Sequence, residues 1–224
     1  MEKSMKRLLA IIVFSFITIC ASAQEDSFCT WTNVTFDKPI GKWSVGMMME
    51  YRHKFHEGES KTDQFFVRPK FSYSALGWLK FGCQFDIAQT SAGSTLRFLP
   101  DVTFSKKVGD FSFAFRQRVQ ATWKVEQGGY AGTVLRSRAR VNYNIPETPL
   151  SVHFAIEPYW AEFKPDGFSW FQKTRWYAGI DIKILDNLTL RPEYLCMAYH
   201  NHKGLYPRRT YDDHIFYMTF AIKL

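Results

Sequence analysis

Charged side chains recur at every second position along many stretches of the chain, and most of the basic ones are arginines. In residues 43–55, for example, Glu50 and Arg52 alternate with Met49 and Tyr51. A period of two places charged residues on one face of a β-strand and apolar residues on the other. Confined charges must pair or stay hydrated, and arginine is favoured where they meet carboxylates or anions. The chemistry that this pattern predicts is ion pairing and attraction of anions, with no catalytic residue.

The polar strand faces carry fourteen basic and six acidic residues. Fifteen of these are predicted to form an interior charge network: Glu50, Arg52, Arg68, Asp86, Arg97, Arg116, Arg118, Arg136, Arg138, Arg140, Glu157, Arg175, Asp181, Arg191 and Glu193. The other five are Lys54, Lys70, Lys80, Lys183 and Asp101. One interpretation is a salt-bridge network that stiffens a narrow barrel, and the other is an electropositive passage for small anions, because rings of Arg and Lys favour anionic permeants.

Eleven alternating stretches supply these faces, each about as long as the ~9–11 residues of a tilted membrane-spanning strand. They cover residues 28–36, 43–55, 63–75, 78–89, 96–105, 111–123, 133–145, 151–160, 173–184, 188–199 and 211–224. The predicted fold is all-β, an antiparallel up-and-down transmembrane β-barrel of 10–12 strands. Bacterial single-chain barrels nearly always have an even number of strands, so the eleven stretches correspond to ten strands or to twelve, and twelve is favoured.

Short and long connections alternate along the chain. The short ones lie at residues 76–77, 108–110, 146–149 and 186–187, and the longer ones at 56–62, 90–95, 124–132, 161–172 and 200–210. Outer-membrane barrels have short periplasmic turns and longer outer loops. With a periplasmic C-terminus, Trp123 and Trp160 are expected at the outer rim and Tyr73 and Tyr143 at the inner rim, as in an aromatic girdle.

The direction of the apolar face separates a membrane barrel from a lipocalin-like soluble barrel, whose apolar face is inside. About five bulky side chains on each strand would overfill a small lumen, and the arginine-rich polar face suits confinement better than solvent. We therefore expect an apolar exterior in contact with lipid, including Met47, Phe71, Phe85, Phe113 and Phe220.

The N-terminus has the features of a secretory signal peptide. Basic residues precede an apolar run at 8–19, and Ala21-Ser22-Ala23 forms a small-residue cleavage site. The expected organisation is a signal peptide over 1–23 and one outer-membrane barrel domain over 24–224, located in the bacterial outer membrane after cleavage. Lipidation of Cys20 is disfavoured because Ile19 precedes it. The three remaining cysteines, an odd number, do not suggest a disulfide framework.

An outer-membrane lipid-modifying hydrolase, of phospholipase or lipid A deacylase type, is the alternative function. It needs a nucleophile or metal beside a histidine base. Ser151 and His153 share one strand face, but they follow a short turn and point into the lumen. His200, His202, Asp212, Asp213 and His214 flank the last long loop at spacings that are irregular for a metal site. No catalytic group, metal, cofactor or nucleic-acid partner is predicted.

Several sequence features, taken in their order along the chain, resemble those of one known family. They are Trp31 leading into 43–52, Arg68-Pro69, the arginine pairs Arg116/Arg118 and Arg136/Arg138, Glu157, Arg175 through Gly179, and the closing 214–224. This order is similar to that of the uncharacterised bacterial outer-membrane barrels called domain of unknown function twenty-four-ninety. The resemblance implies an outer-membrane location and no activity. Expected partners are outer-membrane lipid, the barrel-assembly machinery and small anionic solutes. The chain ends in Leu224 where many such barrels end in Phe.

Overall fold

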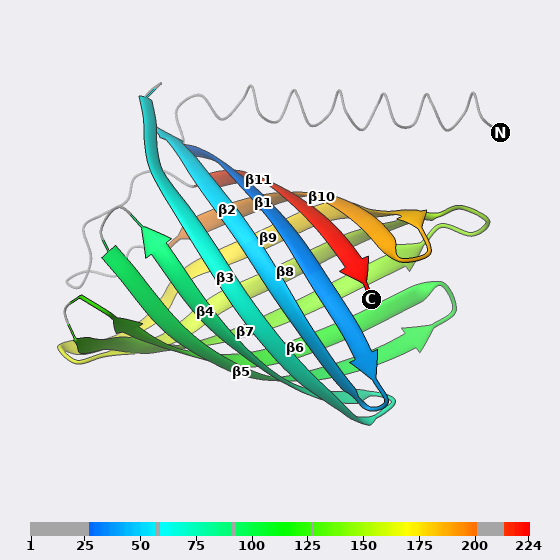
Figure 1. Cartoon of the computed structure of the whole chain (residues 1–224), viewed down its shortest axis with the longest axis horizontal. Coiled ribbons are helices and arrows are strands. Elements are labelled where there is room, and N and C mark those ends of the chain that lie inside the picture. Colours follow the sequence, from blue (N-terminus) through cyan, green and yellow to red (C-terminus); the bar gives the residue numbers. More distant parts are fainter. Residues whose placement is uncertain (1–26, 57–58, 91–92, 127, 201–212) are drawn as a thin grey trace.

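The described part of the chain is a closed β-barrel (Figure 1). The computed structural model describes residues 27–56, 59–90, 93–126, 128–200 and 213–224. Its eleven strands are β1 (Ser27–Ile40), β2 (Trp43–His56), β3 (Glu59–Leu76), β4 (Leu79–Thr90), β5 (Gly93–Val108), β6 (Phe111–Lys124), β7 (Gly129–Asn144), β8 (Leu150–Lys164), β9 (Gly167–Leu185), β10 (Leu188–Tyr199) and β11 (Asp213–Lys223). No helix among these residues is long and apolar enough to cross a membrane.

Each strand pairs antiparallel with its sequence neighbours, and β1 pairs with β11 to close the barrel. The prediction of twelve strands is wrong, because the described residues form eleven. An up-and-down sheet with an odd number of strands brings its first and last strands together in the same direction. The β1–β11 ladder is accordingly parallel and runs from Ser27↔Asp213 to Asp37↔Lys223. We call this ladder the seam. It pairs the backbone groups of both edge strands.

All the short turns and the C-terminus lie at one end of the barrel, on the right in Figure 1. This short-turn end includes Gly41 and Gly109, whose φ values of 60° and 59° suit tight hairpins. At the opposite end, four of the five long connections expected from sequence are much shorter, because β3, β5, β7, β8 and β9 extend into them. The fifth, at 200–210, lies almost wholly outside the described residues.

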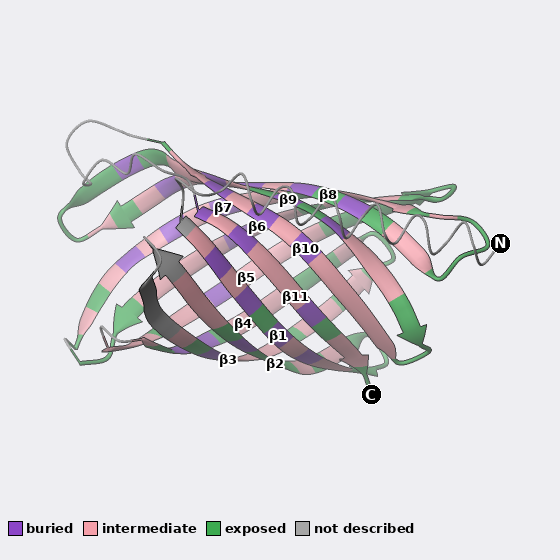
Figure 2. Cartoon of the chain, turned by 90° about the horizontal axis from the view of Figure 1, so that it is seen from above, coloured by how far each residue is buried: buried purple, intermediate pink, exposed green. Residues whose placement is uncertain are grey.

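Exposed and less exposed residues alternate along the strands (Figure 2). The five apolar side chains expected on the exterior, Met47, Phe71, Phe85, Phe113 and Phe220, are all exposed, with relative exposures of 37–49%. Their neighbours in sequence point into the barrel. The pleat therefore separates an apolar outside from a largely polar inside.

One part of the interior wall is apolar, which the sequence pattern did not predict. A buried cluster lines the inside of the seam and the neighbouring strands: Cys29, Trp31, Ala155, Tyr177, Leu195, Met197 and Ile215. Cys29, one of the three cysteines of the described chain, belongs to this cluster. Charged residues lie beside this cluster on the same strands, since Glu157 is on β8 and Arg175 on β9.

Candidate functional site: the charged interior

The first interior cluster joins β2, β3, β4 and β5 around two carboxylates. Glu50 is 1% exposed, accepts a 2.6 Å hydrogen bond from Arg52 Nε and lies 3.9 Å from Arg68 Nη2. Arg68 also donates to Asp86, whose Oδ2 lies 3.9 Å from Arg97 Nη1. Three guanidinium groups therefore share two buried carboxylates, a geometry that charge-assisted hydrogen bonds stabilise.

The second cluster gathers arginines from β6, β7 and β9 around one carboxylate of β8. Glu157 is 2% exposed, and its oxygens lie 2.9 Å from Arg116 Nη2, 3.8 Å from Arg136 Nε and 3.8 Å from Arg175 Nη1. Tyr177 donates a 2.7 Å hydrogen bond to the same carboxylate. One negative charge thus faces three positive ones, so this cluster has a surplus of positive charge.

A third cluster lies towards the short-turn end, on β7 to β10. Glu193 contacts His153 at 3.0 Å and lies 3.8 Å from Arg138 Nη2. Asp181 pairs with Arg140 at 3.2 Å and with Arg191. His153 fits here because Gly179 lies opposite it, where a Cβ would come within 2.8 Å of the imidazole ring.

Aromatic rings hold several of these guanidinium groups in place. Arg52 lies 3.7 Å above the ring of Trp31, and Arg138 lies 4.2 Å above that of Tyr177. The Tyr159 ring lies 5.2 Å from Arg136 and 4.9 Å from Arg175. Such cation–π contacts favour a fixed orientation of the planar arginine head.

Three cavities follow one another through the interior. The one nearest the long-connection end has a volume of about 310 Å³ and includes Lys54 and Asp213. The middle chamber, of about 260 Å³, shares Trp31 with it and borders all of the first two clusters. A third cavity of about 450 Å³ reaches Lys223 near the short-turn end and shares Arg116 with the middle chamber. The side chains therefore do not fill the barrel.

All fifteen residues of the predicted network point into the barrel. Eleven of them line the middle chamber: Glu50, Arg52, Arg68, Asp86, Arg97, Arg116, Arg118, Arg136, Arg138, Glu157 and Arg175. The remaining four, Arg140, Asp181, Arg191 and Glu193, belong to the third cluster near the short-turn end. The structure thus brings most of the network to one chamber.

Sequence reasoning missed the tyrosines and one lysine of this chamber. Tyr217 donates a 2.8 Å hydrogen bond to Glu50, and Lys173 lies 4.8 Å from the ring of Tyr159. The signal for them was present in the alternation. Tyr177 and Tyr217 occupy the inward positions of β9 and β11, two residues from Arg175 and Ile215, respectively.

The residues of the alternative hydrolase are placed differently. Ser151 and His153 face inward on β8 as expected, but the imidazole of His153 is engaged by Glu193. No group of three or more potential metal ligands occurs among the residues with described placement. His202 and Asp212 lie outside those residues. These features provide no support for a hydrolase.

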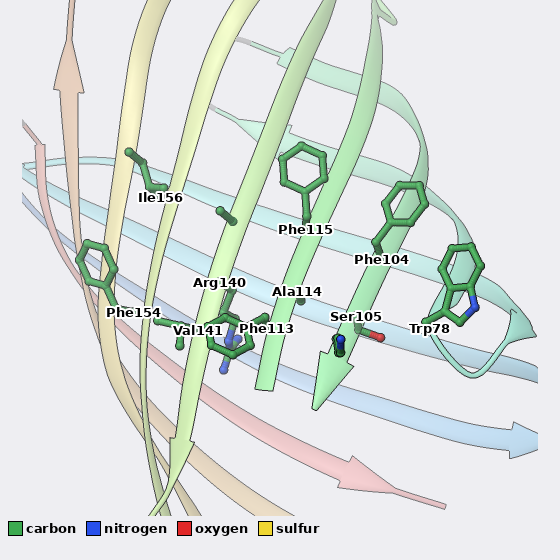
Figure 3. A pocket seen from close by; sticks show the side chains of 12 residues that line it. Trp78, Phe104, Ser105, Phe113, Ala114, Phe115, Arg140, Val141, Phe154 and Ile156 are labelled. Carbon is green, nitrogen blue, oxygen red and sulfur yellow. The ribbon is translucent and has the colours of Figure 1, made fainter. Parts of the chain in front are cut away.

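A groove of about 600 Å³ lies on the outside of the barrel (Figure 3). Its rim includes Trp78, Phe104, Phe115 and Phe154. Ala139 forms its floor, since it pairs with Phe115 on one side and with Ile156 on the other. The groove belongs to the apolar exterior and is distinct from the charged chamber.

The fold is similar to that of a solved porin. A NanC porin matches with a TM-score of 0.56 at 12% identity, over 89% of this chain and 98% of the porin chain. A KdgM porin matches with a TM-score of 0.49 at 12% identity, over 75% and 90% of the two chains. No curated protein matches the chain. The family model described as "Protein of unknown function (DUF2490)" matches residues 28–205, which confirms the resemblance seen in the sequence, and the chain belongs to that family.

Proposed function

We propose that the protein is an integral barrel of the bacterial outer membrane that forms a narrow pore for small solutes and prefers anions. The observation that carries the proposal is the succession of three interior cavities bordered by a basic excess. Rings of Arg and Lys lower the electrostatic barrier for anions and raise it for cations. The porin fold of the NanC neighbour supports a barrel of this kind.

The exterior supports the membrane location. Aromatic pairs lie near both ends of the strands: Trp43–Tyr73 and Phe111–Tyr143 at the short-turn end, Trp123–Tyr130 and Trp160–Trp170 at the opposite end. Exposed Phe, Met and Val side chains lie between them. Two aromatic belts that flank an apolar band match the two water–lipid interfaces of a bilayer.

Planar-bilayer recording of the purified full-length protein tests the proposal. We expect conductance with a higher permeability for chloride than for potassium. The triple variant R136Q/R138Q/R140Q should lose much of this selectivity, because it removes three interior positive charges. The matched triple K38Q/K106Q/K107Q removes three exposed charges near the short turns and should change selectivity far less.

Two results would count against the pore. If the correctly folded protein gave no conductance in the bilayer, the protein would be a closed structural barrel. A silent bilayer combined with turnover of phospholipid or lipid A would favour the hydrolase alternative, and mass spectrometry of the lipid extract measures such turnover. Equal selectivity of the two triple variants would show that the interior arginines do not set the preference.

A further inference from the structure

The middle chamber carries more positive charge than its carboxylates balance. Its border includes nine basic side chains, namely Arg52, Arg68, Arg97, Arg116, Arg118, Arg136, Arg138, Lys173 and Arg175, and three acidic ones, Glu50, Asp86 and Glu157. Arg118 pairs with Asp101, which borders the adjoining cavity. The carboxylate of Glu193 lies 3.8 Å from Arg138, beyond hydrogen-bond distance. The excess therefore remains after the neighbouring carboxylates are included.

The excess is concentrated on the wall formed by β6, β7 and β9. Glu157 is the carboxylate that Arg116, Arg136 and Arg175 share, and only Arg116 approaches it within hydrogen-bond distance. On the opposite wall, Glu50 and Asp86 each accept a hydrogen bond from an arginine. An anion entering the chamber is thus attracted to the β6–β7–β9 wall.

This wall also has donors without an acceptor in the described part of the chain. The Nε atoms of Arg116, Arg136, Arg138 and Arg175 are buried and lack a hydrogen-bond partner among the described residues, as does Arg97 Nε across the chamber. Arg136 as a whole is 8% exposed. Buried donors without acceptors are costly, and donors that carry charge are costlier still. An oxyanion supplies acceptor oxygens and countercharge together.

The arginine heads are already oriented. Arg138 rests on Tyr177, and Arg136 and Arg175 both lie against Tyr159, so binding would not require three long side chains to be ordered. Preorganisation of this kind raises affinity because it lowers the entropic cost of association. The planar guanidinium group suits carboxylate and phosphate oxygens, which it binds in pairs.

We infer that the middle chamber is a discrete binding site for a small polyvalent oxyanion of the carboxylate or phosphate type, held by Arg116, Arg136, Arg138 and Arg175. This inference rests on the proposed function, since the pore would be the route by which the anion reaches the chamber. The volume of about 260 Å³ limits the ligand to a small molecule, because ordinary ligand pockets begin at ~300 Å³. Because the chamber has a surplus of several positive charges, it should bind anions with several negative charges more tightly than anions with one.

Isothermal titration calorimetry of the detergent-solubilised full-length protein, with citrate and pyrophosphate as probes in a chloride buffer, tests the site. Citrate represents the carboxylates and pyrophosphate the phosphates, so their relative affinities distinguish the two sources. R136Q and R175Q should each weaken binding by roughly 10- to 100-fold, the loss of one charged hydrogen bond. The matched variant K38Q, which removes an exposed charge far from the chamber, should bind as the wild type does.

E157Q separates a binding site from a merely structural cluster. It removes the carboxylate that competes for the same arginines, so citrate or pyrophosphate should bind several-fold more tightly although the barrel becomes less stable. A structural role alone predicts lower stability with no gain in affinity, and that result would overturn the inference. Equal weakening by R136Q and K38Q would overturn it as well.

The outcome is separable from that of the pore. A conducting bilayer in which neither citrate nor pyrophosphate binds would overturn the binding site and leave the pore intact. Binding that depends on Arg136 and Arg175 in a protein with a silent bilayer would support the site and refute the pore.

Discussion

Replacing Glu157 by Gln tests the electrostatic account of the interior most directly. The change keeps the size of the side chain and an oxygen that accepts from Tyr177, but it removes the countercharge of Arg116, Arg136 and Arg175. The wild-type carboxylate is 2% exposed. Stability should therefore fall, because three positive charges lose their shared partner.

The magnitude follows from the three distances of 2.9, 3.8 and 3.8 Å. A charge pair about 4 Å apart contributes about 1 kcal/mol in water and about 4 kcal/mol at an effective dielectric constant of 20. The value for water is the lower bound of this range, and three pairs at that bound give about 3 kcal/mol. This sum meets the lower end of the ~3–5 kcal/mol measured when one partner of a buried ion pair is removed.

Guanidinium unfolding in lipid vesicles, followed by tryptophan fluorescence, measures the change. The control is D186N, which removes an exposed carboxylate paired with Lys183 and should leave stability unchanged. Bilayer recording of E157Q should in addition give a higher anion-to-cation permeability ratio, because one of the three carboxylates of the middle chamber is gone. Unaltered stability, or a lower ratio, would refute the reasoning.

Two further predictions concern the exterior and the long-connection end. Phe85 lies midway along β4, whereas Phe113 lies near the start of β6. An arginine on the lipid face costs more at the midplane than near an interface, so F85R should lower the free energy of unfolding in vesicles by about 2–4 kcal/mol and F113R by about 0–1 kcal/mol. Equal costs would contradict the membrane placement. The backbone N–H of Ser94 donates to Glu126 at 2.7 Å and lowers the pKa of its carboxyl below the ordinary 4.5. A lowered pKa stabilises the ionised form, so this contact is complete above pH 4.5 and is lost as the pH falls through the lower folded value. The NMR shift of the Ser94 amide should follow that titration, and E126A should abolish it; a titration that persists in E126A would exclude the carboxylate as its cause.

The eleven strands could be predicted because a period of two is a local property, visible in each stretch alone. Their ends could not. Residues 161–172 contain the polar residues of a loop, yet β8 and β9 continue through most of them and are joined by a tight turn. Extra strand length is stabilised there by pairing across the hairpin, as in the contact of the Phe163 and Phe168 rings at 4.8 Å.

The strand number was mispredicted because it depends on how the first and last strands pair to close the barrel. The sequence of a single stretch contains no information about that pairing. The same limit applies to the site. Alternation predicts that Glu157 and Arg116 face inward, but their 2.9 Å contact joins β8 to β6 across the intervening β7. Such partners follow from tilt and register, so the sequence predicts the charged interior and not which carboxylate serves which arginine.

The seam determines when the barrel can be completed during folding. Its first and last strands are far apart in the chain, and the hydrogen bond from Asn33 to Thr219 spans 186 residues. Contacts of such long range form slowly, since the whole intervening chain must be ordered or looped before they are made. Until β11 arrives, β1 and β10 carry unpaired backbone groups that can template pairing with another chain. A nascent barrel of this topology therefore depends on its last eleven-residue strand to remove its aggregation-prone edges.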